Sequence, residues 1–394
     1  IDNEAAADWT IVHIHADDTP AFLYSLSNAL AMRDIYIYRV HIASTLGKVH
    51  DQLFVRWRRG GKITSAAGQR ELHFIVMLIN QFTHFLTVAP NPVMALQHFD
   101  RLVDRLADDA ARGEDLQWLW EDNTLKALAT VLGSSHFLWE DFLRLHYDTL
   151  LPIFKDLRAA EQRLSKDDLT ARLQQALQGA TTAAAGKHAL NAFKDQEVFR
   201  IDMGHLLHHE RLLGVFSDEL ADLAEVVLAE ALELAQNALQ ARYGHPRLMA
   251  GQPCMFALFG LGKLGGRELG YASDLEMLCV YSGQGQTSGP QQIAVSQYAE
   301  LLVQQLLDLI VARHSGTFEI DLRLRPFGSK GPLATSLDAF REYYRHGGQA
   351  APFERQALIK LRGVAGDPAL RQVVETLRDA FVYSAEPFGL ETAI

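Results

Sequence analysis

The sequence contains very little cysteine, and its net charge has the wrong sign for a protein that coats nucleic acid or anionic lipid. Only two of the 394 residues are cysteines, Cys254 and Cys279. Two cysteines cannot form a disulfide framework, so they indicate a reducing, intracellular environment. The formal net charge of -11 argues against nucleic acid and membrane surfaces as partners. We therefore expect a cytoplasmic protein with neither partner.

Long hydrophobic runs are also missing. Polar side chains interrupt the most apolar helical stretch, residues 72–88, whereas a bilayer span needs about 20 nearly unbroken apolar residues. The start lacks the basic region and apolar run of a secretory signal peptide. The chain begins with Ile1 rather than Met and ends at Ile394 within a continuing segment, so we expect a fragment of a longer protein. Hydrophobic residues make up 48%, enough for the ordered cores of two to four domains.

The first part of the chain has the pattern of a small α/β module. Residues 10–15, 35–43 and 52–57 alternate roughly between apolar and polar side chains, which predicts strands, and residues 22–30 have apolar side chains at helical spacing. The order strand, helix, strand, strand, with an acidic-proline turn after the first strand, resembles an ACT domain. This resemblance implies an amino-acid effector. Most such domains carry glycine directly after the proline, where this chain has Ala21.

In the rest of the chain the residue pattern changes near residue 244. Residues 68–243 have almost continuous helical periodicity. A stretch rich in glycine and proline follows, and then short strand patterns at 255–259, 274–281 and 318–325 that are separated by a helix pattern. We therefore predict an α+β multi-domain fold.

A glycine-rich turn follows the first of these short strands. Gly260, Gly262, Gly265 and Gly266 leave main-chain N–H groups open to an anion, and Lys263 adds a positive charge. The spacing matches neither a dinucleotide-binding fingerprint nor a Walker A loop. The turn alone is compatible with an anion-binding site or with a simple connection between two secondary-structure elements.

The two strand patterns after this turn carry charged residues at every second position. Asp274 and Glu276 are two residues apart, so both carboxylates leave the same face, where they repel each other unless a cation is present. Asp321, Arg323 and Arg325 repeat this spacing on the third strand. One acid and two guanidinium groups suit a metal-bound polyphosphate. The alternative is a solvated sheet face with surface ion pairs.

Three segments of this region carry a resemblance to a known family. They read GLGKLGGRELGYASDLEM (260–277), EIDLRLRPFGSKGPL (319–333) and FERQALIKLRGVAGD (353–367). They resemble the N-terminal nucleotidyltransferase domain of the glutamine synthetase adenylyltransferase and deadenylase family, which belongs to the DNA polymerase β nucleotidyltransferase superfamily. Residues 123–143 and 193–207 resemble the helical region that precedes this domain in that family.

The resemblance implies a two-metal nucleotidyltransferase site with two Mg²⁺ ions and ATP or ADP as the nucleotide. Glu276 stands where the family usually has Asp, and Phe353 stands where it often has Trp. Metal binding and catalysis are assigned to Asp274, Glu276 and Asp321, and nucleotide binding to Gly262, Lys263, Gly265, Gly266, Ser273, Arg323 and Arg325.

The implied reaction is addition of AMP to a tyrosine of glutamine synthetase, or its phosphorolytic removal, in the regulation of nitrogen assimilation. The direction stays open. Glutamine synthetase is the implied partner, with a PII-type regulator as a second. One alternative is a relative of the uridylyltransferase that modifies PII, which shares the nucleotidyltransferase motif and ACT domains. Another is a regulatory module without catalysis.

These interpretations give a predicted domain order: an ACT-like regulatory domain in 1–65, a helical domain in 66–244, the nucleotidyltransferase domain in 245–370, and the start of a further helical segment in 371–394. Two other motifs carry less weight. His205 and His209 are four residues apart, a metal-ligand spacing, but Leu206 stands where a zincin motif needs Glu, so helix-surface histidines are favoured. RWRR at 56–59 is interpreted as a solvated strand end.

Overall fold

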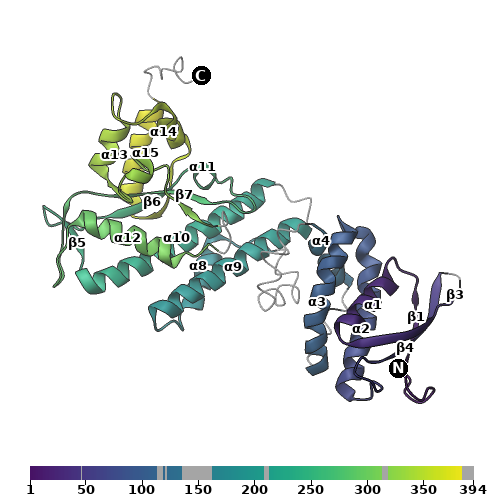
Figure 1. The fold of residues 1–394 in the computed structure, drawn as a ribbon. Coiled ribbons are helices and arrows are strands. Elements are labelled where there is room, and N and C mark those ends of the chain that lie inside the picture. The colour runs from purple at the N-terminus through teal and green to yellow at the C-terminus, as the bar shows by residue number, and fades with distance from the viewer. Residues whose placement is uncertain are drawn as a thin grey trace. The chain divides into compact units, whose positions relative to one another are not determined.

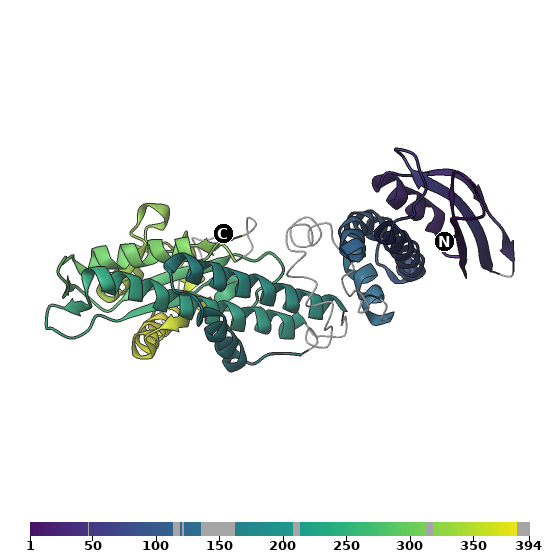
Figure 2. The ribbon, with the colours of Figure 1, turned by 90° about the horizontal axis from the view of Figure 1, so that it is seen from below.

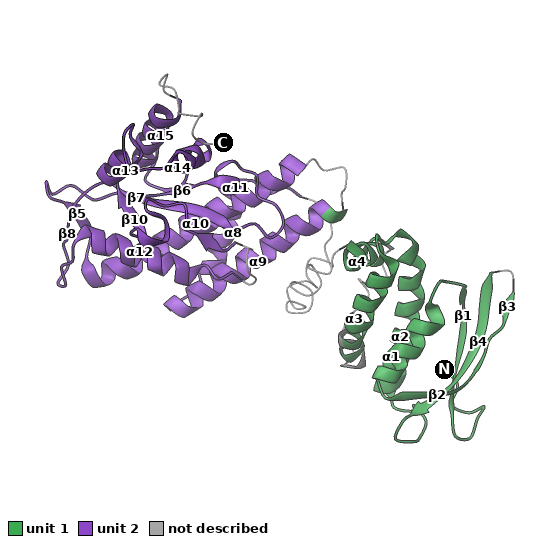
Figure 3. Ribbon diagram, turned by 45° about the horizontal axis from the view of Figure 1, so that its top comes forward, with its two compact units in different colours: residues 1–161, 206–208 green, residues 162–205, 209–394 purple. Residues whose placement is uncertain are grey.

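The computed structural model describes residues 1–45, 47–112, 119, 122–134, 162–207, 213–312 and 318–383. The chain folds into two compact units, coloured separately in Figure 3: one of residues 1–161 with 206–208, and one of residues 162–205 with 209–394. Both helices and mixed sheets are present, so the predicted α+β multi-domain class is confirmed. The predicted domain boundaries at 65, 244 and 370 stay predictions. None of the helices within the described residues is long and apolar enough to span a membrane.

The first unit begins with the predicted strand, helix, strand, strand order. Its sheet has the order β1-β4-β2, with antiparallel pairing throughout and the short β3 added to β4. The alternating pattern predicted one buried and one exposed face, and this is confirmed: Val12 and Ile14 of β1 are buried, while His13 and His15 are exposed. The elements are β1 (Thr10–Asp17), α1 (Phe22–Met32), β2 (Ile35–His41), β3 (Ser44–Thr45) and β4 (Lys48–Trp57).

Helices cover one face of this sheet, as Figure 2 shows. Ser65 caps α2 by accepting a hydrogen bond from the N–H of Gly68. Arg33, which follows α1, donates to Glu71 of α2 and to Asp104 and Asp108 of α3, so one guanidinium ties three helices together. These added helices are α2 (Ala66–Phe85), α3 (Pro92–Arg112) and α4 (Asp122–Ser134).

The turn before α1 has a strained residue at the position where glycine is usual in ACT domains. Ala21 has φ 60° and ψ 10°, a left-handed conformation that costs a residue with a Cβ about 1–2 kcal/mol. We expect Ala21→Gly to stabilise the first unit by about 0.5–1 kcal/mol, because part of this gain is offset by the greater freedom of glycine in the unfolded chain. Urea unfolding measures the change, with Ala31→Gly inside α1 as a control that must destabilise. An unchanged or lower midpoint for Ala21→Gly would contradict the strain.

The second unit contains long helices and a mixed sheet (Figure 1). Gly244, with φ 75°, directly follows the last residue of α10 and ends the helix. The helices are α8 (Lys166–Leu177), α9 (Ala183–Leu207), α10 (Leu213–Tyr243), α11 (Gly262–Gly265), α12 (Val295–Leu309), α13 (Leu337–Tyr344), α14 (Pro352–Ala357) and α15 (Pro368–Val382). The strands are β5 (Pro246–Leu248), β6 (Phe256–Gly260), β7 (Leu275–Tyr281), β8 (Gly285–Thr287), β9 (Ile320–Asp321), β10 (Ala334–Ser336) and β11 (Arg362–Gly366).

The main sheet of this unit has the order β10-β7-β6-β11, and β9 also pairs with β7. Both β9 and β10 run parallel to β7, at its beginning and at its end. Leu278 and Val280 of β7 join a core with residues of α13 and α15, while Phe256 of β6 contacts Tyr298 of α12 on the other face. Helices therefore cover both faces, and Glu276 shares the face of Leu278 at the uncovered start of β7.

The predicted strand over residues 318–325 is wrong in length. Only Ile320 and Asp321 form β9, and the chain turns from Leu322 onward. Arg323 and Arg325 are therefore not successive residues of one strand face. The turn is held by the Arg325 side chain, which is 8% exposed and donates to main-chain carbonyls of the loop 322–332.

Candidate active site

The glycine-rich turn lies directly against the carboxylate of Glu276. Gly262, at the start of α11, has φ 46°, and a Cβ there would lie 1.4 Å from Glu276 Oε2. The N–H of Lys263 donates to the same oxygen over 3.3 Å. A Cβ on Gly265 would lie 1.9 Å from the carbonyl oxygen of Lys360. Glycine is thus needed at 265, where main-chain atoms leave no room for a Cβ, and favoured at 262 by the positive φ and the nearby carboxylate.

Two of the three predicted acids are neighbours on adjacent strands. Glu276 of β7 is paired in parallel register with Asp321 of β9, so both carboxylates leave the same side of the sheet. Asp274 lies just before β7, two residues from Glu276 along the chain. Main-chain bonds from Leu275 and Phe318 hold this end of the two strands together. The fold therefore brings the predicted acids to one sheet end, below the glycine-rich turn.

The guanidinium of Arg323 already neutralises part of this charge. It donates to both oxygens of Asp321, with 2.6 Å between Nη2 and Oδ2. This hydrogen bond is the main reason why the pKa of Asp321 lies below its usual value. The same bond raises the pKa of Arg323, and the charges of Asp274 and Glu276 raise it further. A cation thus lies within electrostatic reach of all three acids.

The chemistry of this donor set suits Mg²⁺, which prefers carboxylate oxygens. Arg323 contacts Asp321 directly, and the charges of Asp274 and Glu276 act on it from a greater distance. Within the part of the chain that the structure describes, however, no group of three or more Asp, Glu, His or Cys side chains is close enough to hold a metal ion. The residues fit the ion by type, and an ion shared by all three would have to draw their carboxylates closer together and replace Arg323 at Asp321.

Two residues assigned to the nucleotide have structural contacts instead. The Arg325 guanidinium donates hydrogen bonds to the main-chain carbonyls of Leu322, Ser329, Gly331 and Pro332. In this arrangement it is not free for the phosphate contact expected from the sequence. Ser273 is 5% exposed, and its Oγ accepts a hydrogen bond from the N–H of Gly270. Arg325 shapes the loop after Asp321, and Ser273 shapes the loop before Asp274. Lys263 is exposed at the turn.

Sequence reasoning missed a cluster of charged side chains that supports the glycine-rich turn. Glu225 of α10, 5% exposed, accepts hydrogen bonds from Arg267, Arg362 and Lys166. Arg362 also donates to the carbonyls of Leu264 and Gly265, the last residues of α11. Arg267 and Arg362 lie inside the segments 260–277 and 353–367 that carry the family resemblance. Their presence in those segments was the signal that could have identified them. Their acidic partner could not be found, because it lies far away in sequence.

Aromatic packing fixes the loop that leads into Asp274. Tyr271 packs on Phe216 of α10 with 4.7 Å between ring centroids, and Phe216 stacks on His205 of α9 at 4.5 Å. Burial raises the pKa of the nearby Asp202 well above its usual value. Burial raises the pKa of Tyr271 as well, with a contribution from Asp202. The predicted partner of His205, His209, lies outside the described residues.

The family model of glutamate-ammonia ligase adenylyltransferase matches residues 125–376, which is more than half of the chain. The chain belongs to this family. The match contains every residue predicted for the site, and it begins after the sheet of the first unit. The resemblance inferred from the sequence is therefore confirmed.

Curated relatives agree with this assignment. A protein of Acinetobacter baylyi is 35% identical over 61% of this chain, one of Methylococcus capsulatus is 40% identical over 48%, and one of Thioalkalivibrio sulfidiphilus is 33% identical over 70%. Each is named bifunctional glutamine synthetase adenylyltransferase/adenylyl-removing enzyme. The matches cover 25%, 20% and 28% of these relatives, so the chain spans about a quarter of their length.

Proposed function

We propose that the second unit is a nucleotidyltransferase that transfers AMP to, or by phosphorolysis from, a tyrosine hydroxyl of glutamine synthetase. The observation that carries the proposal is the parallel pairing of Glu276 with Asp321 below a turn that only glycine can form. The names of the relatives, which specify both addition and removal of adenylyl groups on glutamine synthetase, support the substrate. The direction in this chain stays open, because both reactions use the same phosphate chemistry.

In the proposed mechanism Asp274, Glu276 and Asp321 would hold Mg²⁺, and the ion would supply stabilisation of the negative charge that develops during phosphoryl chemistry. The N–H groups of the α11 turn and the exposed Lys263 contact the nucleotide phosphates. Arg323, whose side chain is exposed, leaves Asp321 and binds phosphate oxygens.

The remaining contacts position these groups. Arg325 holds the loop after Asp321, and Ser273 holds the loop before Asp274, so both act without touching the nucleotide. Arg362 fixes the end of α11 through two main-chain carbonyls. These contacts fix the positions of the glycine-rich turn and the acids before the substrate binds.

An assay with both directions tests the proposal. The 394-residue chain is incubated with Mg²⁺, α-labelled ATP and unmodified glutamine synthetase, and separately with phosphate and adenylylated glutamine synthetase. We expect Mg²⁺-dependent label transfer in the first reaction, or Mg²⁺- and phosphate-dependent release of ADP in the second. Omission of Mg²⁺ is the control. No product in either reaction, with folded protein, would reject the proposed function.

We further propose a cytoplasmic location, which the free and buried Cys254 and Cys279 support. An amino-acid effector at the ACT-like part and a PII-type partner stay predictions. The uridylyltransferase alternative is tested in the same assay by replacing ATP with UTP and glutamine synthetase with PII.

A further inference from the structure

A cleft in the second unit lies apart from the candidate active site. Its volume is about 500 Å³, within the range of about 300–1,000 Å³ that is usual for small-molecule sites. One wall includes Tyr281, the last residue of β7, whereas Glu276 lies near the start of the same strand. Helices α12 and α13 both pack against β10, which also lines the cleft (Figure 3). The cleft is therefore a second candidate site and not part of the first.

One acidic side chain and no basic side chain line this cleft. Among the described residues in its wall none is Lys, Arg or His, and Glu300 of α12 supplies the one carboxylate. Glu300 Oε1 accepts a hydrogen bond of 2.8 Å from the N–H of Leu333, whereas Oε2 accepts none from the described residues. A carboxylate oxygen without a partner attracts a positively charged donor and repels an anion. The cleft thus suits an organic cation.

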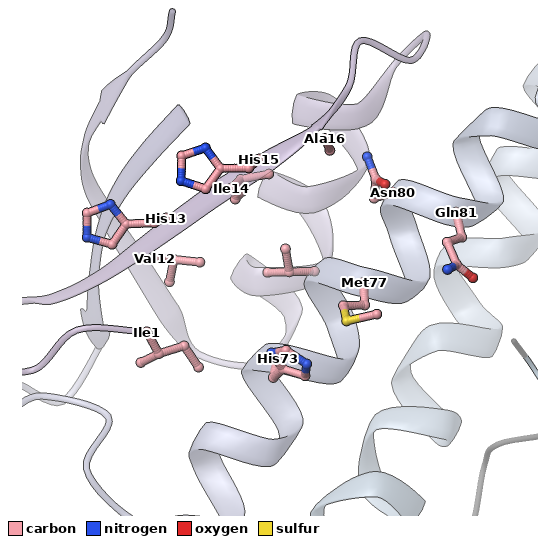
Figure 4. A pocket seen from close by; sticks show the side chains of 11 residues that line it. Ile1, Val12, His13, Ile14, His15, Ala16, His73, Met77, Asn80 and Gln81 are labelled. Carbon is pink, nitrogen blue, oxygen red and sulfur yellow. The ribbon is translucent and has the colours of Figure 1, made fainter. Parts of the chain in front are cut away.

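The pocket of the first unit has the opposite character. His13, His15 and His73 line it, as Figure 4 shows, and its volume is about 230 Å³. Imidazole groups become positively charged slightly below neutral pH, so this pocket can gain positive charge, and no carboxylate among the described lining residues balances it. A preference for cations is therefore a property of the α12 cleft and not of every pocket in this chain.

An aromatic residue in a strained conformation also lines the α12 cleft. Phe327 has φ 65° and ψ 12°, a left-handed conformation that is uncommon for a residue with a bulky side chain. It is 53% exposed, although its ring packs against Tyr343 with 4.6 Å between centroids. Strained residues concentrate at ligand clamps and switch regions. The exposed surface of this ring is available to the apolar part of a ligand and, through its π face, to a cation.

The cleft shares the loop that follows Asp321. Pro326, Phe327 and Pro332 of this loop line the cleft. The loop begins directly after β9, and the Arg325 guanidinium fixes its shape by donating to main-chain carbonyls within it. A ligand that binds only the closed loop stabilises it, because opening of the loop would then require the ligand to dissociate.

We propose that this cleft binds a small organic ammonium ion with an aromatic or aliphatic body. The ammonium group pairs with Glu300, the body packs against Phe327 and Pro332, and Ser296 and Gln297 supply further hydrogen-bonding groups. Binding holds the loop after Asp321 in its observed conformation. The proposal is independent of the nucleotidyltransferase reaction, because it concerns a different site and is tested by binding alone.

Benzylamine, which joins an ammonium group to a phenyl ring, is the probe. We expect it to bind the 394-residue chain in isothermal titration calorimetry with a dissociation constant on the order of 1 mM, as is usual for a ligand of this size. Benzoate has the same ring and the opposite charge, so it should bind at least about tenfold more weakly. Bound benzylamine should also slow hydrogen exchange of the amides of Gly328 and Gly331, which form hydrogen bonds within the loop.

Two variants and a matched control locate the site. Glu300→Gln keeps an acceptor for the N–H of Leu333 and removes the charge, so benzylamine should bind at least about tenfold more weakly. Ala339→Leu adds bulk at an exposed helix position in the cleft wall and should weaken binding at least about tenfold as well, because it occupies volume that the ligand needs. Glu233→Gln makes the same chemical change at an exposed position of α10 outside the cleft and should bind as the wild type does.

Three results would overturn the proposal: no benzylamine binding, benzoate binding as tight as that of benzylamine, or equal benzylamine affinity of the wild type and both cleft variants. Unchanged exchange of the loop amides with benzylamine bound would reject the effect on the loop. Urea unfolding checks that each variant folds. If Glu300→Gln does not fold, Ala339→Leu and the comparison with benzoate decide.

Discussion

Asp274→Asn is expected to lower nucleotidyl transfer about 1000-fold without changing the stability of the protein. Asp274 is partly exposed just before β7, and asparagine keeps its shape while removing the charge that a metal ion needs. Metal ions contribute several kcal/mol to transition-state stabilisation, and about 4 kcal/mol corresponds to 1000-fold in rate. The rate is measured as label transfer or phosphorolysis, and stability is measured as the urea midpoint.

The control for this variant is Asp338→Asn. Asp338 is an exposed aspartate on α13 whose carboxylate pairs with Arg341, so the same chemical change there should leave the rate within about twofold. Mn²⁺ binding followed by electron paramagnetic resonance gives a second measurement. Unchanged Mn²⁺ affinity in Asp274→Asn, together with a normal rate, would refute the metal assignment.

Glu225→Gln is expected to destabilise the second unit by about 3 kcal/mol. The buried carboxylate accepts from Arg267, Arg362 and Lys166, and glutamine leaves these three cations with less negative charge. Removing one partner of a buried ion pair typically costs 3–5 kcal/mol, and the lower value applies because Asp218 and Asp222 still pair with Arg267. The urea midpoint measures the loss.

The pH dependence of this loss identifies its cause. Burial alone would raise the pKa of Glu225, but the hydrogen bond from Lys166 and the charge of Arg362 outweigh it and lower the pKa. A lowered pKa means that the carboxylate stabilises the fold above its unfolded pKa of about 4.3 and loses this effect as pH falls through the folded value. The difference between wild type and Glu225→Gln should therefore shrink below about pH 4.

Glu230→Gln on the same helix is the matched control. The pKa of Glu230 is raised by burial and by the charge of Glu233, so its ionised form is disfavoured in the folded state. Removing that charge should leave stability unchanged or slightly higher. If Glu230→Gln were as damaging as Glu225→Gln, the loss would come from the helix and not from the ion cluster.

Much of the fold could be predicted because the periodic signals are local. The alternation of residues 10–15 predicts β1, and the apolar run at 255–259 predicts β6 nearly to the residue. The acids Asp274 and Glu276 and the glycine-rich turn could be identified because their spacing is fixed by the chain itself. Side-chain periodicity and turn chemistry act over a few residues, so the sequence alone contains this information.

The segment 318–325 shows where local signals fail. Charged residues at every second position suit a strand, yet the chain leaves the sheet after Asp321. The turn is stable because Arg325 finds carbonyls of its own loop and becomes buried, which a period-two pattern cannot express. Likewise, the partner of Arg362 is Glu225, which is 137 residues away, so only the packing of α10 against the glycine-rich turn reveals it.

Several features depend only on residue type and local spacing, so the sequence alone was sufficient for them. They are the low cysteine content, the net charge, the strand and helix periods and the set of acids. Only the tertiary structure decided which groups meet: Glu276 beside Asp321, Arg323 on Asp321, and Arg362 at the end of α11. These depend on contacts between distant segments, whose free energies come from burial and pairing in three dimensions.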